Sequence, residues 1–199
     1  MPNTAIELFA KRRTQYALNR NLPIGRDGTL ALIKEAVRLA PSSFNSQSSR
    51  ALILFGDESV AFWDLIKDAL RAIAPAEQFG KTEARLDGFA AGAGTVLFYE
   101  DQEVVKGLQE QFALYAEHFP VWSEHSTAIA QYAVWTALAD AGIGASLQHY
   151  VPFADERIRQ RWSVPASWKL RAQMPFGGNA APVGEKSFIE DDQRFLVFG

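Results

Sequence analysis

The sequence contains no cysteine and no long run of apolar residues. Without a thiol, this chain of 199 residues cannot form a disulfide, a thiolate metal site, an iron–sulfur cluster or a cysteine nucleophile. No apolar stretch approaches the roughly 20 residues that a membrane-spanning helix needs, and the first residues do not have the pattern of a signal peptide. We therefore expect a cytoplasmic protein that does not contact a membrane.

Charge and histidine exclude two further classes of function. The chain has 20 Lys and Arg against 23 Asp and Glu, without a long basic run, which argues against a nucleic-acid-binding face. The three histidines are His118, His125 and His149, and none has the spacing of a metal-binding pair. We expect neither a nucleic-acid partner nor a metal.

Length and periodicity predict one domain spanning residues 1–199, because a chain of this size with 48% hydrophobic residues can bury a sizeable core. The apolar pattern predicts helices over residues 4–11, 58–73, 102–118 and 155–161, a helix capped by Thr29 and ended by Pro41, an extended segment at 145–149, and strands at 51–55, 95–99, 169–176 and 194–198. Helices and strands do not alternate strictly, which favours an α+β fold over a doubly wound parallel sheet.

The segment from residue 126 to 141 is apolar around its whole circumference, with Gln131 and Asp140 as its only strongly polar residues. Such a helix must be buried on most sides. It therefore lies at the centre of the fold, in a subunit interface, or both. The aromatic segment from Phe112 to Trp122 is either helical core or the roof of a ligand pocket.

Two polar segments near the N-terminus could bind a ligand. Arg12 and Arg13 could hold a phosphate between their guanidinium groups, helped by the Thr14 hydroxyl, although an Arg pair at a helix end can also be a solvated surface. A second segment follows a helix and precedes a strand, and its polar residues are Ser42, Ser43, Asn45 and Gln47. Their donors and acceptors match the edge of a flavin ring, whereas the alternative is an ordinary loop.

Two later segments are weaker candidates. The small residues of the segment 142–148 would let the backbone approach a flat ring, although Gly142 could be only a helix cap. The loop 177–186 ends in Lys186, which is either a third phosphate cation or an exposed surface residue. Because FMN has a phosphate at one end and a polar-edged ring at the other, the four segments together suggest an FMN site.

The order of these segments resembles the nitroreductase family of FMN-dependent oxidoreductases, especially its short bacterial and fungal members, from about Ile6 to Phe198. The resemblance implies an α+β fold, an α-β-α sandwich around a central mixed or antiparallel sheet, and a homodimer with two FMN sites at its interface. It implies that the phosphate and ribityl chain lie near Arg12, Arg13, Thr14 and Lys186, that the isoalloxazine lies against Ala145, Ser146 and Leu147, and that Ser42, Ser43, Asn45 and Gln47 come from the partner subunit. The chain departs from the wider family at Tyr16, at residues 48–50 and at Phe188.

The resemblance also implies NADH or NADPH as the electron donor and nitroaromatics or quinones as acceptors, in a ping-pong cycle. The two GxG patterns, at Gly92 and Gly142, have no third glycine at the offset of a dinucleotide-binding motif, which agrees with a single shared pocket. We expect no catalytic side chain, because the flavin itself carries the hydride. The alternatives are a non-catalytic flavin sensor, a flavin enzyme of this fold with another reaction such as oxidation or dehalogenation, and a hydrolase at Ser146, whose elbow motif lacks its second glycine.

Overall fold

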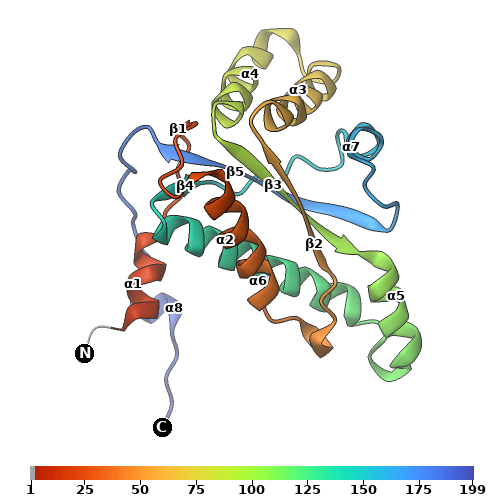
Figure 1. Cartoon of the computed structure of the whole chain (residues 1–199). Helices are drawn as coiled ribbons and strands as arrows, with labels where there is room; N and C mark the ends of the chain where they lie inside the picture. The colour runs from red at the N-terminus through yellow and green to blue at the C-terminus, as the bar shows by residue number, and fades with distance from the viewer. Residues whose placement is uncertain (1–2) are drawn as a thin grey trace.

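A computed structural model describes residues 3–199, apart from the side chains of residues 76–78. A five-stranded sheet lies between two layers of helices (Figure 1). Its strands are β1 (Leu18–Asn19), β2 (Ser49–Phe55), β3 (Gly94–Asp101), β4 (Ile143–Ala145) and β5 (Trp168–Asn179). The order is β1-β5-β3-β2, β4 pairs with β5, and every pairing is antiparallel. The predicted α+β class with an antiparallel central sheet is confirmed.

The helices divide between the two faces of the sheet. One face is covered by α3 (Asp57–Arg71), α4 (Ala76–Ala90) and α7 (Asp155–Trp162), and the other by α2 (Gly25–Leu39) and α6 (Phe119–Asp140) (Figure 1). The remaining helices are α1 (Thr4–Lys11), α5 (Gln102–Gln111), α8 (Asp191–Arg194) and the 3₁₀ turns η1 (Ser43–Asn45) and η2 (Ala113–Tyr115).

The central strand β3 divides the core into two halves, because successive side chains point to opposite faces of a sheet. Leu97 and Tyr99 pack into the core beneath α3 and α4, while Val96 and Phe98 pack into the core beneath α2 and α6. A strand covered on both faces has a continuous apolar sequence. The strand predicted at 95–99 is therefore confirmed.

The helix predicted at 126–141 is longer than expected and begins at Phe119, with Pro120 in its first turn, where a missing N–H costs nothing. Its inner side carries the buried Val134 and Leu138. Its outer side carries Val121, Ile129 and Tyr132, which are 55%, 44% and 39% exposed. This helix is therefore apolar toward both the core and the surface.

Other predicted elements were wrong in their ends or in kind. Thr29 does not cap α2, which begins at Gly25; its hydroxyl instead donates to the Gly25 carbonyl at 2.7 Å inside the helix. The helix predicted at 102–118 ends at Gln111, and α4 was not predicted because its glycines are poor helix formers.

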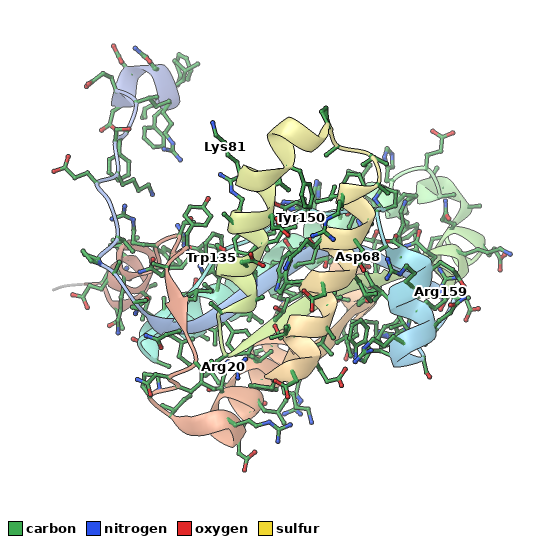
Figure 2. All side chains as sticks on the ribbon, turned by 90° about the horizontal axis from the view of Figure 1, so that it is seen from above. Arg20, Asp68, Lys81, Trp135, Tyr150 and Arg159 are labelled. Atoms are coloured by element: carbon green, nitrogen blue, oxygen red, sulfur yellow. The ribbon has the colours of Figure 1, made fainter. Side chains whose placement is uncertain are left out.

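The predicted strand at 194–198 does not form. The segment that follows β5 carries α8 and the C-terminal residues away from the body of the fold (Figure 1 and Figure 2). Leu196, Val197 and Phe198 are 84–89% exposed. Their apolar sequence predicts burial, but the described part of the chain offers no neighbouring strand at that position.

Candidate functional site

The N-terminal arginine segment and the small-residue segment meet next to each other. Thr14 forms a parallel β-bridge with Ala145, and the backbone N–H of Gln15 donates to the Ala145 carbonyl at 2.9 Å. The indole of Trp135 on α6 donates to the same carbonyl at 3.1 Å. Two segments about 130 positions apart, which the sequence singled out separately, thus share one junction.

Gly144 is required at this junction by the closeness of its neighbours. A Cβ atom at this position would lie 2.3 Å from Asn179 Oδ1 and 2.7 Å from Gln15 Cγ. Asn179 is itself held by a 3.1 Å hydrogen bond from its side-chain amide to the Gly142 carbonyl. A side chain fits here only if the side chains of Asn179 and Gln15 move away.

The expected phosphate cations have different surroundings. Arg12 stacks over Trp135 and Tyr132, with its guanidinium carbon 4.5 Å and 5.7 Å from the ring centroids, and its buried Nε has no partner among the described residues. Arg13 donates to the Gly184 carbonyl at 2.6 Å. Lys186 follows two residues later, is exposed, and places its ammonium 4.8 Å from the Phe188 ring centroid. Arg13 and the Lys186 loop are therefore brought together within one chain.

Beside this junction lie two hollows. The first, of about 330 Å³, is lined by Arg13, Gln15, Gly144 and residues 181–183, among others. The second, of about 520 Å³, is lined by Leu70, Lys81, Thr82, Arg85, His149, Tyr150 and Phe153. We call this second cavity the basic hollow, because its described lining contains two cations, Lys81 and Arg85, and no carboxylate. Burial raises the pKa of Tyr150, and the positive charge of Arg85 opposes that rise.

The cations of the basic hollow were missed by the sequence interpretation. Lys81 and Arg85 lie four positions apart on α4, and residues at this spacing share one helix face. His149 and Tyr150 follow directly after the segment 145–148. Figure 2 shows Lys81 on α4, and Tyr150 beside α4 and its neighbour α3. Recognising α4 in the sequence would have pointed to both cations.

The Ser/Asn/Gln segment forms a strained loop at the other end of α6. Phe44, Asn45 and Gln47 have φ values of 57°, 49° and 48°, in the left-handed region that residues other than glycine seldom adopt. The backbone N–H of Gln47 donates to Ser42 Oγ at 2.9 Å, and the backbone N–H of Ser43 donates to Ser126 Oγ at 3.2 Å. Strain held by hydrogen bonds at exposed polar residues is typical of a functional loop.

An aromatic cluster is attached to this loop. The Phe44 ring lies with its centroid 4.9 Å from that of Phe112, 5.2 Å from that of Phe119 and 6.0 Å from that of Trp122. Phe44 is nevertheless 50% exposed. The cluster therefore presents an aromatic surface beside Asn45 and Gln47.

The loop and the Thr14–Ala145 junction do not form one site within the chain. Ser126 contacts the loop and Trp135 contacts the junction. These residues lie nine positions apart on α6, which is about 14 Å along a helix. The polar residues 42–47 are thus separated from the other predicted site residues by about half the length of α6.

The residues expected beneath a flat ligand are largely covered by the chain itself. Ala145 and Ser146 are 1% and 0% exposed. The Ser146 hydroxyl accepts a 3.0 Å hydrogen bond from the side-chain amide of Gln148. A ligand on this surface would contact the partly exposed side chain of Leu147, with the buried Ala145 and Ser146 beneath it.

The match to known proteins is extensive. The family model for the nitroreductase family matches residues 9–178. The chain belongs to the nitroreductase family. Membership identifies it as an oxidoreductase, and the α-β-α arrangement around an antiparallel sheet is the nitroreductase fold.

Individual nitroreductases match nearly the whole chain. The Saccharomyces cerevisiae nitroreductase FRM2 is 33% identical over 188 residues, or 94% of this chain and 93% of its own. The structure of the nitroreductase CinD from Lactococcus lactis with chloramphenicol is 49% identical, covers 98% of this chain and 100% of its own, and superposes with a TM-score of 0.90. An FMN complex of a Desulfovibrio desulfuricans protein, at 18% identity, 100% and 99% coverage and a TM-score of 0.73, shares the fold.

The described residues lack two further kinds of feature, a metal-binding cluster and a membrane-spanning helix. No group of three or more His, Cys, Asp or Glu side chains could hold a metal ion there. No helix in the described part of the chain is long and apolar enough to cross a membrane.

Proposed function

We propose that this nitroreductase binds FMN non-covalently and transfers electrons from NADH or NADPH to nitroaromatic or quinone acceptors in a ping-pong cycle. The observation that carries the proposal is the basic hollow beside the Thr14–Ala145 junction. It combines Lys81 and Arg85 with the aromatic side chains of Tyr150 and Phe153, and no carboxylate lies among its described lining residues. This chemistry suits a planar ring that becomes negatively charged.

The residues fit both ends of FMN. The close packing at Gly144 holds Ala145 in place at the junction. The basic hollow is large enough for a ring system. Arg13 and the Lys186 loop provide cations for a phosphate, and the buried Nε of Arg12 is a donor without a partner among the described residues. Guanidinium and ammonium groups bind phosphate through charge-assisted hydrogen bonds.

In this assignment FMN supplies the hydride chemistry, and the side chains position and stabilise. Lys81 and Arg85 stabilise negative charge at the ring, because preorganised cations in a partly enclosed site act strongly on developing charge. Ala145, Ser146 and Leu147 support one face of the ring. No side chain of the hollow is required as an acid or a base.

A second copy of the chain completes the site. Ser42, Ser43, Asn45 and Gln47 lie about 14 Å along α6 from the junction, too far to contact the same ring in one chain. Val121, Ile129 and Tyr132 leave an exposed apolar strip on α6 between the two half-sites, and the C-terminal residues Leu196–Phe198 are also exposed and apolar. Such surfaces mark an interface. In a homodimer, each α6 would bring one subunit's loop to the other subunit's junction.

Flat aromatic ligands of the close structural relatives support the acceptor class. CinD has been crystallised with 4-nitrophenol and with nicotinic acid, at 50% identity to this chain. One is a nitroaromatic, and the other is a pyridine ring like that of a nicotinamide donor. The aromatic cluster around Phe44, brought by the partner, would cover such a ligand.

Spectroscopy and initial-rate kinetics test the proposal together. The FMN-supplemented protein should show bound flavin, which NADH or NADPH bleaches without oxygen and 4-nitrophenol or a quinone restores. Double-reciprocal plots at several acceptor concentrations should be parallel. Bound flavin without turnover would instead identify a flavin sensor, and intersecting lines would require a separate nucleotide site.

A further inference from the structure

A third cavity lies between α7, the end of β3 and the start of β5, with a volume of about 240 Å³. We call it the α7 pocket. It shares no lining residue with the basic hollow. Figure 2 shows Arg159, one of its residues, on α7, across the width of α3 from Lys81. The nitroreductase reaction proposed above makes no use of it.

Two polar groups in the α7 pocket are buried without partners. Tyr99 is 3% exposed, and its hydroxyl has no hydrogen-bond partner among the described residues. The same holds for Oδ1 of Asp155, at the first position of α7. Buried polar groups in native proteins are almost always paired, so two unpaired groups lining one cavity call for a ligand or ordered water.

The two groups are near neighbours. Burial, followed by the negative charge of Asp155, raises the pKa of the Tyr99 phenol, which therefore stays neutral. Burial also raises the pKa of Asp155, and the positive charge of Arg159 opposes that rise. An ammonium group between them could donate one hydrogen bond to the Asp155 carboxylate and another to the Tyr99 oxygen.

The remaining charge of the pocket is cationic. Arg159 is half-buried and its guanidinium lies 3.3 Å from Glu156. Lys169 stands between Trp168 and Leu170, which pack on the pocket side of the sheet, so its own side chain points to the other face. An amine without an acidic group would be repelled by Arg159. An acid without an amine would leave the buried oxygen of Asp155 unpaired.

The rest of the lining is apolar. Ile158, Val164 and Leu170 are 1%, 7% and 3% exposed, and the ring of Trp168 completes the wall. A volume of about 240 Å³ equals the liquid volume of about eight water molecules. The space suits a small molecule with one aliphatic or aromatic group.

We propose that the α7 pocket binds a free α-amino acid with an apolar side chain. The ammonium group donates to Asp155 Oδ1 and to the Tyr99 oxygen, and the carboxylate accepts from Arg159. The side chain lies against Ile158, Val164 and Leu170. Only a zwitterion pairs the buried acid and the cation at once.

Titration calorimetry of the FMN-loaded protein with three matched probes tests this assignment. L-Leucine should bind with a Kd of about 0.1–1 mM. 4-Methylpentanoate, which lacks the amino group, and 3-methylbutylamine, which lacks the carboxylate, should bind at least about tenfold more weakly, because each leaves one charged group of the pocket unpaired. Equal binding of the three probes, or no saturable heat with leucine at about 10 mM, would overturn the proposal.

Variants separate the pocket from general effects on folding. Tyr99→Phe and Asp155→Asn should each weaken leucine binding by at least about tenfold. The matched control is Glu156→Gln, next to Asp155 but outside the pocket lining, which should bind leucine as tightly as the wild type or more tightly because it releases Arg159.

If the buried variants do not fold, Arg159→Gln, at a partly exposed side chain, should still weaken leucine binding several-fold without weakening 3-methylbutylamine. Unchanged leucine binding in Arg159→Gln, or a leucine-soaked crystal with only water between Tyr99 and Asp155, would contradict the assignment.

Discussion

The indole Nε1 of Trp135 donates a 3.1 Å hydrogen bond to the carbonyl of Ala145. This bond attaches the middle of α6 to the segment that we assign to the isoalloxazine face. Arg12 stacks on the indole of the same Trp135, with its guanidinium carbon 4.5 Å from the ring centroid. The helix that carries the exposed apolar strip is therefore directly coupled to the ligand-binding junction, so dimerisation and cofactor binding should depend on each other.

The coupling can be tested on the exposed strip of α6. Ile129→Glu places a charge on a side chain that is 44% exposed and assigned to the interface, so sedimentation should show a monomer at low micromolar concentration. That monomer should also lose FMN, because residues 42–47 of the partner are then absent. The control is Ile73→Glu, which is 66% exposed beyond the end of α3 and should remain dimeric. A flavin-loaded monomer would contradict the composite site.

Gly144→Ala should disturb the junction itself. Its Cβ would lie 2.3 Å from Asn179 Oδ1, and overpacking of this kind costs about 1–3 kcal/mol of unfolding free energy. FMN affinity should fall as well. Gly88→Ala is the control, because nothing lies within 4 Å of its Cβ and it is inside α4, where the change should stabilise by about 0.5–1 kcal/mol. Urea unfolding measures both, and a neutral Gly144→Ala would show that the strand can move.

Lys186→Ala tests the phosphate end more cleanly than Arg12→Ala, because Arg12 also stacks on Trp135 and Tyr132. Loss of one charge-assisted contact, worth about 1.5–3 kcal/mol, should weaken FMN binding roughly ten- to a hundred-fold. Riboflavin, which lacks the phosphate, should bind almost unchanged. Lys106→Ala, another exposed lysine with a 3.7 Å pair to Glu110, should affect neither ligand. Equal losses for FMN and riboflavin would place the effect in folding.

Arg85→Gln tests the basic hollow. Removing this cation should disfavour a negatively charged reduced ring and lower the midpoint potential of the bound flavin, on the order of 30 mV for about 1.4 kcal/mol in a two-electron couple. Lys34→Gln, exposed on α2, is the control and should leave the potential unchanged. An unchanged midpoint potential in Arg85→Gln would show that Arg85 does not act on the bound flavin.

Glu100 should make stability fall as pH rises. This carboxyl is fully buried, its Oε1 accepts a 2.6 Å hydrogen bond from Ser49, and burial raises its pKa above the ordinary value of 4.5. The Ser48 and Ser49 hydroxyls and the charge of Arg50 oppose that rise, while Glu124 adds to it. Between the unfolded and the folded pKa the folded state holds one more proton, so each pH unit in that window costs about 1.4 kcal/mol of stability.

Glu100→Gln should remove this dependence and make the protein more stable than the wild type above the window. Urea unfolding at several pH values from about 5 to 8 measures it. Glu103→Gln, in the first turn of α5 and exposed, is the control and should retain the wild-type slope. A wild-type slope in Glu100→Gln would mean that another group is responsible.

The sequence alone determined the local features of this protein. The apolar run 95–99 predicted a buried strand because period and composition are properties of neighbouring residues. The polar segments around Arg12 and Asn45 were recognisable for the same reason, and their order was enough to indicate the nitroreductase family. Helix α4 was not recognised from the sequence, because its glycines have a low helix propensity.

Only the tertiary structure decided which of these segments meet. Lys81 and Arg85 line the same hollow as His149 because Phe89 of α4 packs against Tyr150, a contact that no local pattern encodes. Tyr99 and Asp155 share the α7 pocket for the same reason. The apolar pattern of α6 required burial but did not say by what, since the hydrophobic effect is proportional to area and has no direction. The folded chain leaves one side of that helix exposed and separates the two half-sites along it.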